Sequence, residues 1–427
     1  MNTANVSEEL LHQIWKYRLF QQKGLITKCS EELEIISTGN HNSDAGPDFH
    51  AAKIKIGSTV WVGNIEIHIR NSDWNKHGHD RDKAYDSIIL HVVYIDDLPN
   101  QKSPNIHPVL ELRSYIQKNI IDNYRNLMEC RDWIPCQKNW HEVPKITKMN
   151  FIERLAIERM EAKSKLIGEL LATNGNNWEI TLYCQLGKYF GAPINSIPFE
   201  LLTKKVPYLF VLKNRDSLNK IESLLFGTAG FLEENLSDPY MLYLQKNYCV
   251  FKKKYQIEPL QKHLWKFLRM RPGSFPTIKI AQFAMLYFQS EHLFSQVIEM
   301  ANLNEMKNLF RVPTSHYWEN HYIPEKASSF QIKNMGTAFI DSLLINAILP
   351  ILFAYAQKNG NQKLLNRSMG FLEEIEGEKN NCIRKFEDLN ITAQSALHSQ
   401  GILQLKKEFC EQQKCLQCSI GIQLLKK

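Results

Sequence analysis

The first patterned segment of the sequence has hydrophobic residues at helical spacing. Between residues 7 and 20 they are Leu10, Leu11, Ile14, Trp15 and Leu19. Ser7 stands just before two acidic residues and is a suitable N-cap. The pattern therefore predicts an amphipathic helix over residues 7–20.

From about residue 25 the pattern changes to short runs in which hydrophobic and polar positions alternate, as in half-buried strands. The predicted strands cover residues 33–36, 51–56, 60–70, 87–94 and 109–112, and a short helix is expected over 80–86. Gly57-Ser58 marks a tight turn between the second and third strands. The first part of the chain thus predicts an α+β fold, a small mixed sheet with flanking helices.

Beyond residue 115 long helical patterns dominate, so we expect a large all-α domain there. The expected helices are 115–129, 150–171, 178–190, 216–227, 239–254, 259–269, 276–287, 290–301, 337–357, 361–375 and 393–407. A stretch with two prolines and several polar residues separates the two patterns. The predicted domains are residues 1–131 and 148–427, joined by a linker over 132–147.

Length and composition support this division. A chain of 427 residues is too long for one ordinary core, and 44% hydrophobic with 23% charged residues is typical of globular proteins. We find neither a membrane-spanning apolar stretch nor a signal peptide, so the expected location is the cytoplasm. The nine cysteines, an odd number, argue against a disulfide framework. A net charge of +7 is compatible with a nucleic-acid partner without requiring one.

The predicted strand over residues 63–70 carries the most informative pattern. Ile65, Ile67 and Ile69 would bury one face of it. The opposite face would carry a row of polar side chains: Asn64, Glu66, His68 and Arg70. Because such a row is costly to bury, it favours a solvated cleft that holds a metal or a phosphate.

Acidic and imidazole groups flank this strand on both sides. Asp48 follows Gly46-Pro47, and an acid there can meet Glu66 on a single divalent ion. Two carboxylates suit Mg²⁺ or Mn²⁺. Asp44, Glu9 and His79 are further candidates, the last from a segment, residues 72–80, that is dense in ligand-type side chains.

Pro47-Asp48 followed by Glu66-x-His68 resembles the PD-(D/E)XK nuclease pattern, and the expected order of helix, strand meander, helix and strand fits it. The resemblance implies a restriction-endonuclease-like fold in which Asp48 and Glu66 hold the metal for phosphodiester hydrolysis. His68 stands where that pattern has lysine, and as base, ligand or phosphate contact it would complete the site. The whole chain also resembles a bacterial family of unknown function, through Asn-x-x-Ala-Gly-Pro-Asp-Phe, Gly-Asn-x-Glu-x-His and Ser-Asp-Trp-x-x-His-x-His.

Other interpretations of these residues remain open. Asp48 could cap a turn, Glu66 and Arg70 could form an ion pair on a solvated strand, and His77 and His79 could be ordinary loop residues. The chain could also be a catalytically silent nucleic-acid-binding or scaffold protein, or a metal hydrolase of a small phosphate-containing molecule. No phosphate-binding loop, dinucleotide fingerprint or nucleophile elbow occurs in the sequence.

Three cysteines lie close together near the end of the sequence, with the spacing C-x4-C-x2-C at Cys410, Cys415 and Cys418. Thiolates at this spacing favour Zn²⁺ or an iron–sulfur cluster. Cys136 is the preferred fourth ligand, with Cys130, Cys382 and His398 as rivals. The alternative is three reduced thiols on a terminal helix.

A basic and aromatic segment, residues 265–276, offers Lys266, Arg269 and Arg271 as phosphate contacts, with Arg70 as a fourth candidate from the first domain. The alternative is that Trp265 and Leu268, at core spacing, pack the segment into the helical domain.

Overall fold

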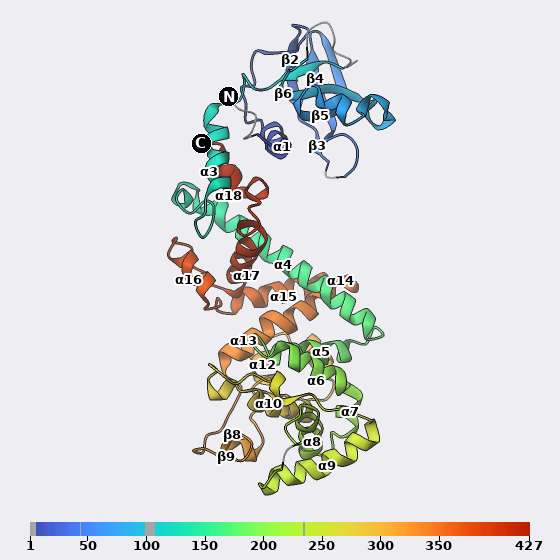
Figure 1. The fold of residues 1–427 in the computed structure, drawn as a ribbon, viewed down its shortest axis with the longest axis vertical. Coiled ribbons are helices and arrows are strands. Elements are labelled where there is room, and N and C mark those ends of the chain that lie inside the picture. Colours follow the sequence, from blue (N-terminus) through green and yellow to red (C-terminus); the bar gives the residue numbers. More distant parts are fainter. Residues whose placement is uncertain (1–5, 43, 99–106, 234) are drawn as a thin grey trace. The chain divides into compact units, whose positions relative to one another are not determined.

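The computed structural model describes residues 6–42, 44–98, 107–233 and 235–427. The chain divides into two compact units. The first comprises residues 1–152, 388–390 and 403–427, and the second comprises 153–387 and 391–402 (Figure 1). The division differs from the expected one in two respects: the first unit extends through residues 132–147, and it also takes in the C-terminal segment with its three cysteines.

The first unit contains a seven-stranded mixed sheet in the order β1-β2-β4-β5-β6-β7, with β3 paired to β4. The strands from β1 to β5 pair antiparallel, whereas β6 runs parallel to β5 and β7 parallel to β6. The strands are β1 (Leu25–Ile26), β2 (Glu32–Ser37), β3 (Asn40–His41), β4 (Phe49–Ile56), β5 (Thr59–Arg70), β6 (Ile88–Ile95) and β7 (Val109–Glu111). This confirms the small sheet and every predicted strand, and it adds the short strands β1 and β3.

Helix α1 (Glu8–Lys16) packs on this unit through buried Leu10, Leu11, Ile14 and Trp15. The Ser7 hydroxyl caps it by accepting a hydrogen bond from the Leu10 amide at 3.2 Å, as its sequence predicts. The connection from β5 to β6 holds α2 (Asp73–Lys76) and the 3₁₀ turns η2 (His79–Arg81) and η3 (Lys83–Tyr85). Trp74, Tyr85 and Ile88 form a small hydrophobic cluster that fixes this connection to the sheet.

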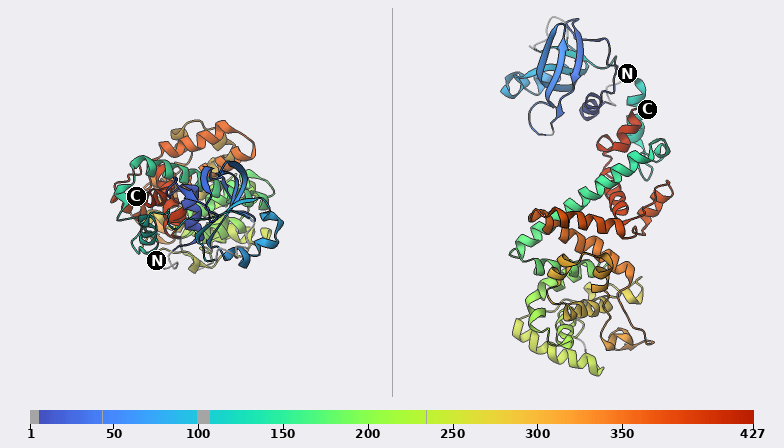
Figure 2. Two further views of the ribbon diagram at one scale, coloured as in Figure 1. Left: turned by 90° about the horizontal axis from the view of Figure 1, so that it is seen from above. Right: turned by 180° about the vertical axis from the view of Figure 1, so that it is seen from behind.

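The rest of the first unit is helical. α3 (Lys118–Glu129) lies beside α18 (Ser419–Leu425), as Figures 1 and 2 both show. The expected linker is not extended: it holds the turn η4 (Trp140–Glu142), and Ile134, Trp140 and Val143 are buried. The C-terminal segment adds the π-helix η9 (Leu405–Cys410) and the 3₁₀ turn η10 (Cys415–Gln417).

The second unit is a helical body with one large hydrophobic core. Its helices are α4 (Lys145–Thr173, which begins in the first unit), α5 (Trp178–Phe190), α6 (Ser196–Lys205), α7 (Tyr208–Lys213), α8 (Leu218–Thr228), α9 (Pro239–Tyr255), α10 (Pro276–Gln289), α11 (Leu293–Glu299), α12 (Leu303–Leu309), α13 (Thr337–Leu343), α14 (Leu349–Lys358), α15 (Gln362–Glu374), α16 (Asn381–Glu387) and α17 (Ala396–Gln404). Short turns η5 (Lys262–Leu264), η6 (Pro272–Ser274) and η7 (His316–Glu319), and a small ribbon of β8 (His321–Ile323) and β9 (Lys326–Ala327), complete it.

Two expectations for this unit were wrong in detail. The helix expected over 259–269 is only the short turn η5, because the extended residues that flank it end the helical backbone. The helix expected over 337–357 is interrupted by a π-helical segment, η8 (Leu344–Ile348). By length and composition this stretch, Thr337–Lys358, could cross a membrane, but 67% of its apolar window is buried inside the unit, as in a core helix.

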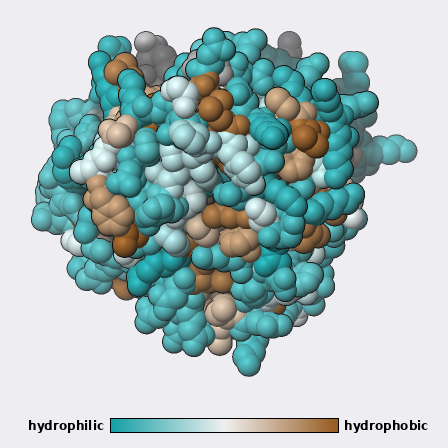
Figure 3. Space-filling view, turned by 90° about the horizontal axis from the view of Figure 1, so that it is seen from below, coloured by the Kyte–Doolittle hydropathy of each residue, from teal (hydrophilic) through white to brown (hydrophobic). Residues whose placement is uncertain are grey.

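Figure 3 shows one face of the molecule coloured by hydropathy. Most of that face is hydrophilic, and its hydrophobic patches are small and separated by polar side chains. Scattered patches of this kind are ordinary on a folded protein and identify no binding surface.

Candidate metal centre

The polar row of β5 lies under the connection from β5 to β6. Ile65 and Ile67 are buried on one face of the sheet, as predicted. On the other face Glu66 and His68 are only 5% and 2% exposed, because the connection with Trp74, His77 and His79 covers them. The expected solvated cleft is therefore wrong for these two residues: a carboxylate and an imidazole are enclosed, and each needs polar partners.

Asp48 and Glu66 lie next to each other. The antiparallel pairing of β4 with β5 sets Phe49 opposite Ile65, which brings the residue before β4 to the middle of β5. The Asp48 amide donates to Glu66 Oε2 at 3.2 Å, and the Ile67 amide donates to Asp48 Oδ2 at 2.9 Å. Two acids are thus held together by the backbone of their own strands.

Two histidines lie beside the Glu66 carboxylate, and a third lies beside one of them. The Glu66 Oε1 atom lies 3.3 Å from His79 Nε2 and 3.6 Å from His68 Nε2. His68 Nε2 also lies 3.1 Å from His77 Nδ1. Gly78, at φ 75°, turns the chain between His77 and His79 so that both imidazoles face the same point.

These separations are those of ligands around one metal ion. Metal–nitrogen bonds of about 2.0–2.1 Å place tetrahedral ligand atoms about 3.4 Å apart. In the described part of the chain, His68, His77 and His79 are the one group of three or more ligand-type residues whose ligand atoms all lie within 4.8 Å of one another. These three imidazoles could hold a metal ion, and the Glu66 carboxylate lies beside two of them.

A second layer orients these groups. His91, on β6 opposite Glu66, places its Nε2 2.9 Å from His68 Nδ1. Tyr85 packs its ring on His79 with 3.8 Å between the centroids. Because His68 Nδ1 is engaged by His91, its Nε2 is the atom turned toward the candidate metal position, as outer partners commonly arrange in metal sites.

The electrostatics of the site also fit a cation. Burial, and then the negative charge of Asp48, raises the pKa of Glu66 to about 9. Burial lowers the pKa of His68 and of His91 to about 3, so both are neutral at pH 7 and His68 can offer a lone pair. Among the described residues the ion pairs of Asp48 and Glu66 are all with histidines. A buried carboxylate without a lysine or arginine partner suits a bound metal.

Helix α1 supplies the edge of the site that is nearer to solvent. His12 Nε2 lies 3.2 Å from Asp48 Oδ2, and the two side chains are 18% and 20% exposed. Burial raises the pKa of Glu8, which also feels the charges of His77 and Asp48. The Nε2 atoms of His12 and His79 are buried, and each lies beside a carboxylate oxygen, Asp48 Oδ2 and Glu66 Oε1 respectively, without a well-aligned hydrogen bond in the described structure.

Other predicted residues lie away from this cluster. Asp44 is exposed, and its amide donates to the Asn42 side chain, which in turn holds the carbonyls of the loop before β4. Glu9 points outward and accepts from Gln417, so Glu8 is the acid of α1 that faces the site. Arg70 is exposed and pairs with Asp97 at 3.8 Å rather than with Glu66.

The predicted cysteines come together in the first unit. Burial, and then the neighbouring Cys418 and Cys415 thiols, raise the pKa of Cys136, and burial, followed by Cys136, Cys418 and Cys415, raises the pKa of Cys410. Cys382 and His398, two of the proposed alternatives, belong to the second unit. Cys130 remains near the group.

In the basic segment of the second unit Trp265 is buried, whereas the side chain of Leu268 is 82% exposed. The expectation that both residues pack into the core is therefore confirmed for Trp265 and wrong for Leu268. Arg269 and Arg271 line a small pocket of about 220 Å³ together with buried Lys279. Lys266 Nζ donates to the His263 carbonyl at 3.3 Å. The expected phosphate contacts of Lys266, Arg269 and Arg271 stay a prediction.

Sequence reasoning offered Glu8 or Glu9 as the acid of the N-terminal helix but missed two histidines. His12 was assigned only to an amphipathic helix, although its i, i+4 spacing from Glu8 puts both on one helical face. His91 looked like one position of a buried strand. Its parallel register with Glu66 could not be read from the strand alone.

A family model matches residues 8–381, and its description is "Protein of unknown function (DUF2851)". The chain belongs to this family. No curated protein and no solved structure matched it. The family description names no activity, so a function has to be argued from the site.

Proposed function

We propose that this protein is a metal-dependent hydrolase that cleaves phosphodiester bonds in nucleic acid. The observation that carries the proposal is the adjacent pair of carboxylates, partly exposed Asp48 and buried Glu66, with His68 and His79 beside Glu66 Oε1 and His77 beside His68. The order of α1, the strand meander up to β5, the short helices and the parallel strand β6 supports the resemblance to the PD-(D/E)XK pattern.

Glu66, His68, His77 and His79 are the proposed metal ligands. Imidazole favours the later transition metals, whereas carboxylate also suits Mg²⁺ and Mn²⁺. Of the two metals expected from the sequence, Mn²⁺ is the better match to this mixed donor set. Such an ion, when bound, polarises a phosphoryl oxygen and lowers the pKa of a bound water.

His12 and Asp48 are assigned the proton-transfer role. His68 is enclosed between His77 and His91, so it serves as a ligand rather than in place of the missing lysine. His12 lies at the partly exposed edge, and its contact with Asp48 Oδ2 fixes which ring nitrogen carries the proton. In this arrangement His12 accepts a proton from the attacking water, and Asp48 holds its ring in place.

The test is a cleavage assay on single- and double-stranded DNA and RNA with protein stripped of metal and then supplied with Mn²⁺ or Mg²⁺. We expect Mn²⁺-dependent cleavage by the parent, and a loss of at least about 100-fold in the rate of Glu66→Gln and His12→Gln. His141→Gln, an exposed histidine of the same unit, is the matched control.

The assay separates the alternatives as well. Salt-dependent binding without cleavage by metal-loaded parent would contradict the hydrolase and favour a silent nucleic-acid-binding protein. Hydrolysis of a small phosphodiester with no action on any nucleic acid would overturn the polymer substrate. Equal cleavage rates for the parent and Glu66→Gln would contradict the assignment of Glu66 to the active site.

A further inference from the structure

We propose that Cys136, Cys410, Cys415 and Cys418 form a second metal centre, an iron–sulfur cluster or a zinc ion, which fastens the C-terminal segment to residues 130–143. This inference does not depend on the hydrolase proposal, because it rests on a different set of residues. Nothing in the family description assigns such a site.

The fold brings four thiols together from segments that lie more than 270 residues apart in the sequence. Cys136, Cys415 and Cys418 are 8%, 8% and 7% exposed, and Cys410 is half-buried. None of these four described cysteines forms a disulfide. Contacts bring their two segments together: Lys406 Nζ lies 5.3 Å from the centre of the Trp133 ring, and the Gln413 side chain donates to the Met128 carbonyl at 3.4 Å.

The backbone around the three C-terminal cysteines is built as a ligand loop rather than as a helix. The π-helix η9 ends at Cys410, and Gln413 at φ 50° reverses the chain. The Cys418 amide then donates to the Cys415 carbonyl at 3.3 Å, which closes a tight C-x2-C turn. The alternative of three thiols on one terminal helix is therefore wrong, since a turn separates Cys410 from Cys415.

A glycine lets α18 pack against this turn. A Cβ atom at Gly421 would lie 2.2 Å from the Cys415 carbonyl oxygen, a distance that no side chain tolerates. The first turn of α18 thus holds the backbone of Cys415 in place, and it does so directly beside the pair of thiols.

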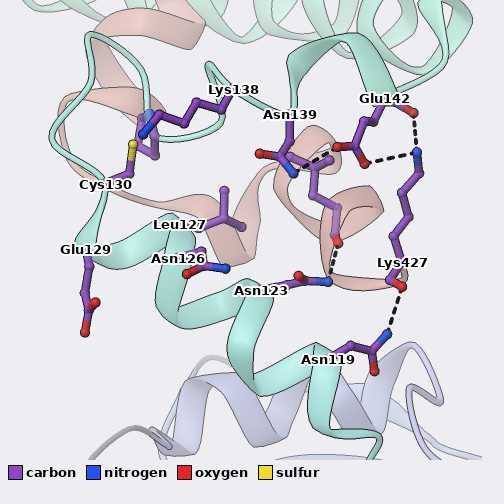
Figure 4. A pocket seen from close by; sticks show the side chains of 12 residues that line it. Asn119, Asn123, Asn126, Leu127, Glu129, Cys130, Lys138, Asn139, Glu142 and Lys427 are labelled. Carbon is purple, nitrogen blue, oxygen red and sulfur yellow. Dashed lines mark hydrogen bonds and ion pairs between the residues drawn. The ribbon is translucent and has the colours of Figure 1, made fainter.

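Polar contacts dock the same segment onto the part of the chain that carries Cys136. Figure 4 shows the side chain of Asn123 donating to the Leu424 carbonyl and Lys427 reaching Glu142, at 3.2 and 3.4 Å. These residues line a pocket of about 540 Å³ whose wall also includes Cys130. Trp140 Nε1 donates to the Leu389 carbonyl at 3.0 Å on the same side. The four thiols are therefore held within one docked substructure.

The thiols are not arranged around a single zinc ion as they stand. Zn–S bonds of about 2.3 Å place four tetrahedral sulfurs about 3.8 Å apart. No three of these four described cysteines have sulfurs within 4.8 Å of one another, since the group that meets this distance in the described chain is the histidine triad. A zinc ion would therefore require the thiols to move closer, and acid-labile sulfide distinguishes an iron–sulfur cluster from zinc.

The segment that carries the cysteines also contacts the helix that carries Glu8 and His12. Gln417, between Cys415 and Cys418, donates to Glu9 Oε1 at 3.3 Å. Glu9 belongs to α1, the helix that carries Glu8 and His12. Holding the turn η10 therefore helps to hold α1 in its position against Asp48.

The experiment uses the full chain purified without oxygen and measures iron, zinc and acid-labile sulfide per chain. The variants are Cys415→Ser/Cys418→Ser, the control Cys249→Ser, an exposed cysteine of the second unit, and His77→Ala/His79→Ala, which removes the other candidate metal site. We expect iron with sulfide, or one zinc, in the parent, in Cys249→Ser and in the histidine variant, and at least a tenfold loss in the cysteine variant. Iron with sulfide retained by the cysteine variant, zinc retained at the parent's level, or neither metal in the parent, would overturn the proposal.

A second measurement covers the case in which the cysteine variant does not fold. The native parent is alkylated with and without a strong chelator, and the modified cysteines are identified by mass spectrometry. We expect Cys136, Cys410, Cys415 and Cys418 to become reactive only after chelation, while exposed Cys29 and Cys249 react in both samples. Equal protection of the four with and without chelator would show burial alone and contradict the centre.

Discussion

Replacing Glu66 by glutamine should stabilise the metal-free protein at alkaline pH and abolish its response to metal. The pKa of Glu66 is raised from 4.5 to about 9 by burial and then by the charge of Asp48. A carboxyl whose pKa is raised in the folded state stabilises that state fully below the unfolded pKa, and this stability is lost as pH rises toward the folded value. Glutamine keeps the shape and can still accept from the Asp48 amide.

The size of the expected stability difference follows from the raised pKa of Glu66. Between pH 4.5 and 9 the free energy of unfolding should fall by about 1.4 kcal/mol per pH unit in the parent relative to the variant. At pH 8 the free energy of unfolding of the parent should lie below that of the variant by at most roughly 5 kcal/mol. Relaxation of the structure and solvent screening reduce this expected difference to about 2–3 kcal/mol. At pH 5 the difference should shrink to below about 1 kcal/mol, because the carboxyl is protonated in the folded state and the pH is only half a unit above its unfolded pKa of 4.5.

The assay is denaturant unfolding of metal-stripped parent and Glu66→Gln at pH 5 and pH 8, repeated with Mn²⁺. We expect the variant to be more stable than the parent at pH 8 only, and Mn²⁺ to stabilise the parent but not the variant. A pH-independent difference would refute the reasoning on Glu66, and equal stabilisation of both proteins by Mn²⁺ would refute its role as a ligand.

Three further predictions follow from the same structure. His91→Gln should weaken Mn²⁺ binding about 10–100-fold by releasing the ring of His68, measured by calorimetric titration; an unchanged affinity would show that His91 only packs. Metal-free protein should lose stability as pH falls from 6.5 toward 3. The reason is that His68 and His91 have a pKa of about 3 in the folded state, so they stay neutral over a range in which the same histidines of the unfolded chain bind protons. A melting temperature that rises over this range would contradict the neutral state of the two histidines. Ser7→Ala should cost about 1 kcal/mol of unfolding free energy through loss of the N-cap bond to Leu10, and Ser58→Ala, in an exposed turn, should cost almost nothing.

Periodicity alone could predict the sheet and most helices. The alternation in β5 correctly assigned Ile65 and Ile67 to the core and set Glu66 and His68 on the opposite face. It could not show whether that face is covered, because the cover comes from the connection to β6, whose turns depend on Gly78 and on packing by Trp74. The burial of Glu66 and His68 was therefore unpredictable from the strand pattern.

The sequence also could not show which residues far apart in the chain lie together in the fold. The spacing of Cys410, Cys415 and Cys418 indicates a ligand loop, and Cys136 is the fourth ligand expected from its place in the sequence; all four belong to the first unit, and their metal site stays a prediction. His12 and His91 could not be found in this way, since neither belongs to a spaced motif and each reaches the site through tertiary packing. The helix expected over 259–269 failed because its hydrophobic residues pack from turns.

The most direct test of the central claim is Mn²⁺ binding to stripped protein, followed by electron paramagnetic resonance, for the parent, His77→Ala/His79→Ala and the control His141→Ala. We predict one tightly bound ion in the parent and in the control, and at least about 100-fold weaker binding in the double variant, because two of four ligands are lost. Binding of equal strength by the parent and the double variant would contradict a metal centre at Glu66, His68, His77 and His79.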